Sequence, residues 1–164
     1  MKIYIVSDVG GTQIRVAAYE AATLSLISNK KIPTQSKGQQ PVDRLIQLIR
    51  ETKMDHQVQA IAVAAPGFLD PELGIVYEAP NIPGWNNYPL QKLLEDVFHV
   101  PVFLGNDANM GALGEWKFGA GIGHSNLLYL TISTGIGGGA IIDNNLLLGQ
   151  KGLAGEFGHV TVLP

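Results

Sequence analysis

Leu104-Gly105-Asn106-Asp107-Ala108-Asn109 lies between an apolar run at 100–104 and a helix-like run at 108–118. The apolar run is rich in β-forming residues, so the chain is predicted to pass here from a strand into a helix. Asp107 then falls at or next to the helix N-cap, where Asn and Asp side chains accept hydrogen bonds from the N–H groups of the first turn. Capping alone would explain this residue.

A second interpretation gives Asp107 a chemical role. Ligands of open α/β sheets bind beyond the carboxyl ends of the strands, which is where this carboxylate is expected. There it would accept the proton of a substrate hydroxyl. Three glycine-containing segments favour this second interpretation: Asp-Val-Gly-Gly-Thr at 8–12, Ser-Thr-Gly-Ile-Gly-Gly-Gly at 133–139, and Gly-Glu-Phe-Gly-His at 155–159.

The composition is that of a globular protein. Hydrophobic residues make up 46% of the 164 residues and charged residues only 15%, which argues against disorder. The net charge of −3 argues against a nucleic-acid partner. The chain has no cysteine, and its longest apolar run is interrupted by glycines and too short to cross a bilayer. We therefore expect a cytoplasmic protein that binds neither nucleic acid nor membranes.

The chain is predicted to begin with a β-meander, with strands at 2–8, 13–19 and 24–33. Gly10 and Gly11 in the first turn fit an ordinary hairpin, because glycine adopts positive φ at no steric cost. They also fit a phosphate site in which the N–H groups of Gly11 and Thr12 and the Thr12 hydroxyl face the ligand. Asp8 would then hold a hydrated Mg²⁺. Arg15 is either near that phosphate or a solvated strand charge, and we favour the second.

Further strands and helices predict a mixed sheet with helices on its faces. Helices are expected at 41–52 and 88–98, and a strand at 58–65. Gly67 follows that strand, where its backbone could approach a sugar. Asn81 lies in a stiff loop at 79–85, where it either binds sugar hydroxyls or bonds its own backbone. Trp85 is expected to be a packing anchor.

The later part of the chain repeats the opening pattern of strand, glycine turn and strand. A strand is predicted at 126–133, a second glycine turn at 134–139 and a returning strand at 140–143. The glycines of Phe-Gly-Ala-Gly-Ile-Gly-His at 118–124 mark the best domain boundary. We therefore expect a first domain at 1–119 and the start of a second at 120–164.

In this order, the motifs resemble the ROK family of sugar kinases, which includes bacterial glucokinases, within the actin-like ATPase superfamily. The resemblance runs over the whole chain. The segments 8–12 and 134–138 resemble the two phosphate motifs of the family. Asn106 and Asp107 resemble its sugar-contacting Asn and its catalytic Asp. The resemblance implies an actin-like (ribonuclease H-like) α/β domain with a mixed sheet flanked by helices, followed by the truncated opening strands of a second such domain.

The resemblance also implies a role for each matching residue. Asp107 would be the catalytic base. The hexose would be bound by Gly67, Asn81, Asn106, Glu156 and His159. The phosphates of ATP would be bound by Asp8, Gly10, Gly11, Thr12, Thr134, Gly135 and Gly137.

His159 resembles a structural zinc ligand, but the cysteines that complete the family's zinc site are missing here. A structural zinc needs four ligands, so zinc is expected only in a longer protein. Either the remainder lies in another chain, or this chain is the N-terminal portion of such a protein. Its second-domain strands would lack sheet partners, which favours self-association as a homodimer.

The function expected from this resemblance is ATP- and Mg²⁺-dependent phosphorylation of a hexose hydroxyl, with glucose first by family frequency. The chain alone is expected to be inactive, and the phosphoryl donor could also be polyphosphate. One alternative is a ROK-type transcriptional repressor, which is disfavoured because the first strand begins at residue 2 and leaves no room for a preceding helix-turn-helix. The other is a non-catalytic sugar- or ATP-binding module, which would not need Asp107.

Overall fold

The computed structural model describes residues 1–132 and 135–161. The chain divides into two compact units, Met1–Gly105 and Asn106–Pro164. Each unit has its own packed elements, and each is described by itself below.

The first unit is built on a five-stranded sheet with the strand order β3-β2-β1-β4-β8. The strands β1, β2 and β3 form the predicted antiparallel meander, whereas β4 runs parallel to β1. The predicted mixed sheet is therefore confirmed. The five strands are β1 (Lys2–Val9), β2 (Gln13–Glu20), β3 (Leu26–Pro33), β4 (Gln57–Ala65) and β8 (Val102–Asn106).

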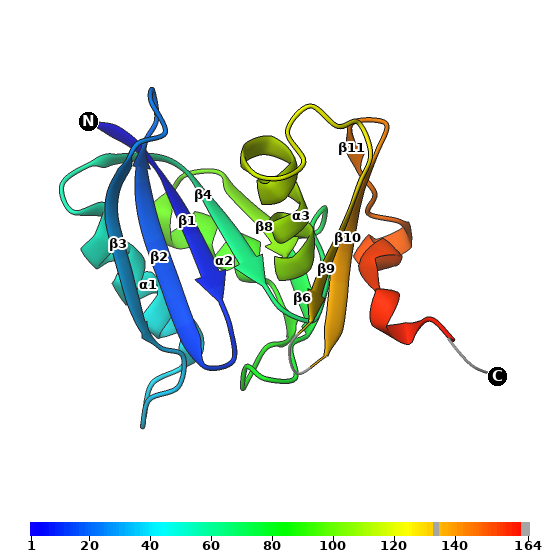
Figure 1. Cartoon of the computed structure of the whole chain (residues 1–164). Helices are drawn as coiled ribbons and strands as arrows, with labels where there is room; N and C mark the ends of the chain where they lie inside the picture. Colours follow the sequence, from blue (N-terminus) through cyan, green and yellow to red (C-terminus); the bar gives the residue numbers. More distant parts are fainter. Residues whose placement is uncertain (133–134, 162–164) are drawn as a thin grey trace. The chain divides into compact units, whose positions relative to one another are not determined.

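Two helices, α1 (Pro41–Lys53) and α2 (Leu90–Phe98), lie behind this sheet in Figure 1. Pro41 begins α1, as predicted, because its fixed φ suits the first helical position and its missing N–H would be unpaired there anyway. The core is formed by the alternate side chains of the strands and the apolar side of each helix. Its largest buried members are Ile3, Ile5, Ile14, Leu45, Leu48, Ile49, Ile61, Ile82, Trp85, Leu90 and Leu94. Among the described residues, no helix combines the length and the apolar character needed to cross a membrane.

A second, small antiparallel sheet in the same unit was not predicted. It contains β5 (Phe68–Asp70), β6 (Ile75–Glu78) and β7 (Asn86–Tyr88). These strands are too short to show an alternating apolar pattern, so the sequence indicated only turns and a loop here. Tyr88 belongs to β7, and α2 begins at Leu90 instead of 88, because the residue before a proline is disfavoured in the helical region.

The second unit contains α3 (Asp107–Phe118) and a three-stranded antiparallel sheet with the order β11-β10-β9. The strands are β9 (Leu127–Ile132), β10 (Ile136–Ile142) and β11 (Asn145–Leu146), and two short 3₁₀ helices follow, η1 (Gln150–Gly155) and η2 (Phe157–His159). In Figure 1, α3 lies on one side of β9 and β10, and η1 and η2 lie on the other. Asp143 and Asn144 form the tip of the β10–β11 hairpin, both with positive φ, as a type I′ turn requires.

The helix α3 packs with the second unit, although the sequence placed the boundary after it, near residue 119. Gly111 allows this packing, because a Cβ there would lie 2.8 Å from the ring of Tyr129 in β9. A Cβ at Gly139 of β10 would likewise lie 2.8 Å from the Ala112 Cβ in α3. These small residues let the helix and the sheet come together. The assignment of evolutionary domains at 1–119 and 120–164 stays a prediction.

Candidate functional site

The turn between β1 and β2 is closed by a backbone hydrogen bond from the Gly10 N–H to the Gln13 carbonyl, 2.9 Å long. Neither Gly10 nor Gly11 has a positive φ. The conformational freedom of glycine, the reason given for these residues in an ordinary hairpin, therefore does not explain them. What explains Gly11 is the approach of another segment.

That segment is the loop that carries Asn81. A Cβ added at Gly11 would lie 2.6 Å from the Asn81 Cβ and 3.0 Å from the Asn81 carbonyl oxygen. Any side chain at position 11 would therefore push the loop away. Two residues that the sequence singled out separately, one for phosphate and one for sugar, are brought into contact by the fold.

Gly67 extends this arrangement. Its φ is +86°, and a Cβ there would lie 2.2 Å from the Glu78 carbonyl oxygen and 3.1 Å from the Ala79 Cα. Both the backbone conformation and the close approach require glycine. Gly67 thus supports the start of the loop whose next residues include Asn81, which is exposed.

An open hollow of about 290 Å³ lies at the β1–β2 turn, lined by Asp8, Gly10, Gly11, Thr12, Gln13 and Arg15. Asp8 and Arg15 are cross-strand partners, and Arg15 Nη1 lies 3.7 Å from Asp8 Oδ2. Both side chains are more than half exposed, so this ion pair contributes little stability. The hollow presents backbone N–H groups, a guanidinium and a carboxylate, a set that suits an anion with an accompanying cation.

In the second unit, Asn106 is the N-cap of α3. Its Oδ1 accepts hydrogen bonds from the N–H groups of Ala108, at 2.9 Å, and Asn109, at 3.3 Å. Asp107 is the first residue of the helix, so its predicted place at or next to the cap is confirmed. Its Oδ1 accepts from the Ala108 N–H at 2.8 Å, and the side chain is exposed.

The second glycine turn was placed wrongly. Strand β10 begins at Ile136, and Gly137 lies within it, opposite Thr131 of β9. Thr134 lies outside the described residues, and Gly135 immediately precedes the strand. The glycines serve packing on both faces of β10: a Cβ at Gly139 would lie 2.9 Å from Asn109 Oδ1, and one at Gly138 would lie 2.3 Å from the ring of Phe157.

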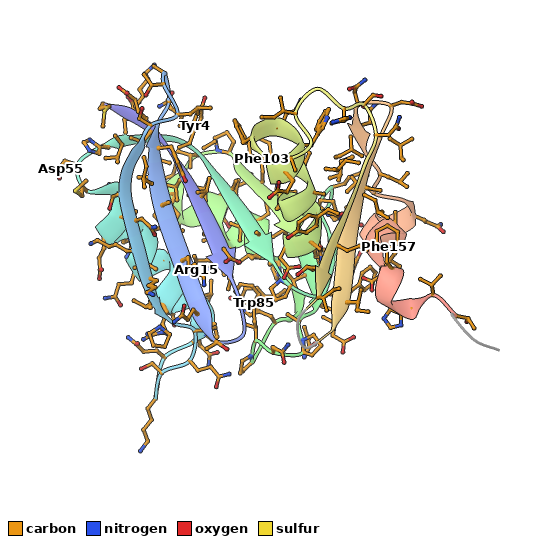
Figure 2. The ribbon with its side chains drawn as sticks, viewed as in Figure 1. Tyr4, Arg15, Asp55, Trp85, Phe103 and Phe157 are labelled. Carbon is orange, nitrogen blue, oxygen red and sulfur yellow. The ribbon has the colours of Figure 1, made fainter. Side chains whose placement is uncertain are left out.

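Glu156 and His159 lie in the segment that packs on β10. Phe157 lies against this strand in Figure 2. A Cβ at Gly155 would lie 2.2 Å from the Gly138 carbonyl oxygen, and one at Gly158 would lie 2.4 Å from that of Ile136. Glu156 and His159 are both exposed, with Glu156 Oε2 3.7 Å from His159 Nε2. The glycines of this motif thus hold the two polar residues close to the strand.

The chain matches the ROK family over residues 4–164. The chain belongs to the ROK family. Over its full length it is 37% identical to the glucokinase of Streptomyces coelicolor, of which it covers 51%. It also resembles the crystal structure of a ROK glucokinase from Streptomyces griseus in complex with glucose and AMPPNP, with a TM-score of 0.86, 37% identity, and coverage of 99% of this chain and 51% of that one.

A third similarity is to a regulator of the family. The xylose repressor of Bacillus subtilis is 44% identical over 102 residues, which are 62% of this chain and 26% of the repressor. This ROK chain has the actin-like ATPase fold of the ROK glucokinases. It spans about half the length of the curated glucokinases that it matches.

The described residues of this ROK chain do not fit the zinc site that the resemblance implies. Within 1–132 and 135–161, no three His, Cys, Asp or Glu side chains come together as a metal would require. His159 is near one such residue, Glu156. A tetrahedral zinc at His159 would need ligands that these residues do not supply.

Thr34 is a residue of the first unit that the sequence did not single out. Its side chain is fully buried, and its hydroxyl donates a hydrogen bond to the Gly10 carbonyl. It lies between a largely exposed strand and a polar linker, so no pattern in the sequence distinguished it from a linker residue. Only the fold brings it to the β1–β2 turn.

Proposed function

We propose that the ROK protein to which this chain belongs transfers the γ-phosphoryl group of ATP to a hexose hydroxyl. The observation that carries the proposal is the exposed Asp107 carboxylate at the N-terminus of α3, in a chain that aligns over its full length with a glucokinase. We propose glucose as the first substrate to test, because glucokinases are prominent among its relatives.

Asp107 is the proposed base. As the hexose hydroxyl attacks the γ-phosphorus, the carboxylate accepts its proton while the leaving ADP takes the electrons of the broken P–O bond. Asn106, whose Oδ1 caps α3, is a proposed contact to a sugar hydroxyl. Asn81, Gly67, Glu156 and His159 are the other proposed sugar contacts.

The β1–β2 turn is the proposed phosphate site of the first unit. Its N–H groups and the Thr12 hydroxyl would donate to phosphate oxygens, and Asp8 would hold a Mg²⁺ through water. The Mg²⁺ supplies positive charge that offsets the charge of the phosphates. Arg15 lies at the same hollow and would compete with the Mg²⁺ for the Asp8 carboxylate. In the second unit, Gly135, Gly137 and Thr134 stay proposed phosphate contacts from the resemblance alone.

A sugar-responsive repressor is the second candidate function, favoured by the similarity to the xylose repressor over 62% of the chain. The two candidates differ in whether they consume ATP. The protein expressed from its own gene should be assayed for hexose-dependent ADP release with glucose, fructose, mannose and N-acetylglucosamine. ADP release with at least one hexose supports the kinase. Sugar binding with no ADP release, together with operator DNA binding, would support the repressor.

A further inference from the structure

Thr34 contacts both sides of the β1–β2 turn. Its hydroxyl donates to the Gly10 carbonyl, and its N–H donates to the Thr12 carbonyl at 2.9 Å. The side chain is 0% exposed, so the hydroxyl has no water to replace this partner. Without this hydroxyl the partly buried Gly10 carbonyl would lose its donor, which destabilises the turn.

The position of Thr34 is itself fixed. The preceding residue, Pro33, ends β3, and its carbonyl accepts a hydrogen bond of 2.9 Å from Nε of Arg44 in α1. Nη1 of Arg44 also donates to Gln39 Oε1 at 2.6 Å. Hydrogen bonds therefore join the end of β3 to Arg44 of α1 through Pro33 and to the β1–β2 turn through Thr34.

The two hydrogen bonds from Thr34 determine which backbone groups of the turn remain available to a ligand. The carbonyls of Gly10 and Thr12 are occupied by Thr34. Within residues 1–132 and 135–161, the N–H groups of Gly11 and Thr12 make no hydrogen bond. The turn is therefore held by its Gly10 and Thr12 carbonyls, with two donors unused beside the hollow, an arrangement that suits an anion.

We propose that Thr34 is a positioning residue of the phosphate site: its buried hydroxyl holds the Gly10–Thr12 turn in the shape that receives the phosphates of the nucleotide. This inference rests on the phosphate role given to the turn in the proposed function. Without the hydroxyl, the turn samples other conformations, and the apparent affinity for nucleotide falls with the fraction of molecules that keep the binding shape.

The chain offers a matched control for the substitution. Thr52 of α1 is also 0% exposed, but its hydroxyl makes no hydrogen bond among the described residues. Thr34→Val and Thr52→Val therefore remove the same group from two equally buried threonines, and only the first removes a contact with the turn. Thr34→Ser keeps the hydroxyl. Should Thr34→Val fail to fold, Thr34→Ala removes the same hydroxyl without adding a methyl group.

The test is the dissociation constant of MgADP, measured by isothermal titration calorimetry on the protein expressed from its own gene, beside thermal unfolding of each variant. Thr34→Val should weaken binding by about tenfold, Thr34→Ser by less than about threefold, and Thr52→Val not at all. Equal affinities of Thr34→Val and Thr52→Val, or equal losses in Thr34→Val and Thr34→Ser, would overturn the inference and leave the proposed function standing. A wild-type protein that does not bind MgADP would overturn both.

Discussion

A carboxylate at a strand-to-helix junction can cap the helix or act as a base, and Asp107 is proposed to act as the base. In this chain the capping of α3 falls to Asn106, so Asp107 is left exposed at the first position of the helix. Asp107→Asn keeps the size and the hydrogen bond from the Ala108 N–H but removes the base. We expect the phosphoryl-transfer rate to fall by about 10²–10⁴-fold, with hexose binding retained.

The measurement is kcat from coupled ADP release, beside hexose affinity from calorimetry. Asp143→Asn is the matched control, because Asp143 is an exposed carboxylate at the β10–β11 hairpin tip. A kcat for Asp107→Asn close to that of the control would show that the base is a different group.

Gly11 gives a second prediction at the scale of one residue. Gly11→Ala places a Cβ 2.6 Å from the Asn81 Cβ, a distance that forces the loop or the turn to move. We expect weaker binding of both MgADP and hexose, since one contact joins the proposed phosphate turn to a proposed sugar residue. Gly114→Ala is the control: nothing lies within 4 Å of a Cβ there, and replacing this helical glycine should stabilise the protein by about 1 kcal/mol.

Calorimetry with each ligand and thermal unfolding check both variants. Loss of stability without loss of either affinity in Gly11→Ala would mean that the contact with Asn81 serves only packing.

At the scale of elements, the sequence predicted the helices and strands that are marked by the pattern of neighbouring residues. The helix that begins at Pro41 and the strands of the meander follow from apolar periodicity and from proline at the first helical position. The sequence did not predict that β10 extends through its glycines, because the reason is the packing of Phe157 on Gly138, and these two residues lie far apart in the sequence. Glycine alone indicates a turn as readily as a close approach.

The same limit applies to the candidate site. Asn106, Asp107 and the glycine turn at 10–11 could be singled out because their residue types have known preferences. The contact of Gly11 with Asn81 and that of Thr34 with the turn depend on how distant segments pack, and spacing along the chain does not encode them.

The junction of β7, α2 and α1 gives a prediction about pH. Burial raises the pKa of Tyr88 above its ordinary value of 10.0, and the negative charge of Asp43 in α1 raises it further. Above about pH 10 the folded state therefore holds the phenolic proton more tightly than the unfolded state does. The free energy of unfolding should then fall as pH rises through this range.

Urea unfolding between pH 8 and pH 11 measures the slope of the free energy of unfolding against pH. Tyr88→Phe should flatten it and Asp43→Asn should reduce it, because each removes one source of the raised pKa. Parallel curves for wild type and Tyr88→Phe would assign the alkaline loss of stability to other groups.

At the scale of the whole molecule, the second unit carries an apolar surface that predicts self-association. The strand β9 lies at one edge of its sheet, and alternate side chains along it are exposed: Leu128 at 59%, Leu130 at 50% and Ile132 at 79%. An open edge with an apolar face is a common site of pairing with another chain. We predict that the 164-residue chain forms dimers and lacks kinase activity by itself.

Sedimentation velocity over a range of concentrations tests the association. Leu130→Lys should shift the chain towards monomer, whereas Leu73→Lys, at a leucine that is 64% exposed in the turn between β5 and β6, should not. A wild-type chain that stays monomeric at every concentration would contradict the prediction.

The most direct test of the proposed function is to identify the product. The protein expressed from its own gene should be incubated with MgATP and glucose and followed by ³¹P NMR. We predict that the γ-phosphate signal is replaced by that of a hexose phosphate, in amounts equal to the ADP formed, and that Asp107→Asn forms almost none. Release of inorganic phosphate without a sugar phosphate, or an equal yield from Asp107→Asn, would contradict the account.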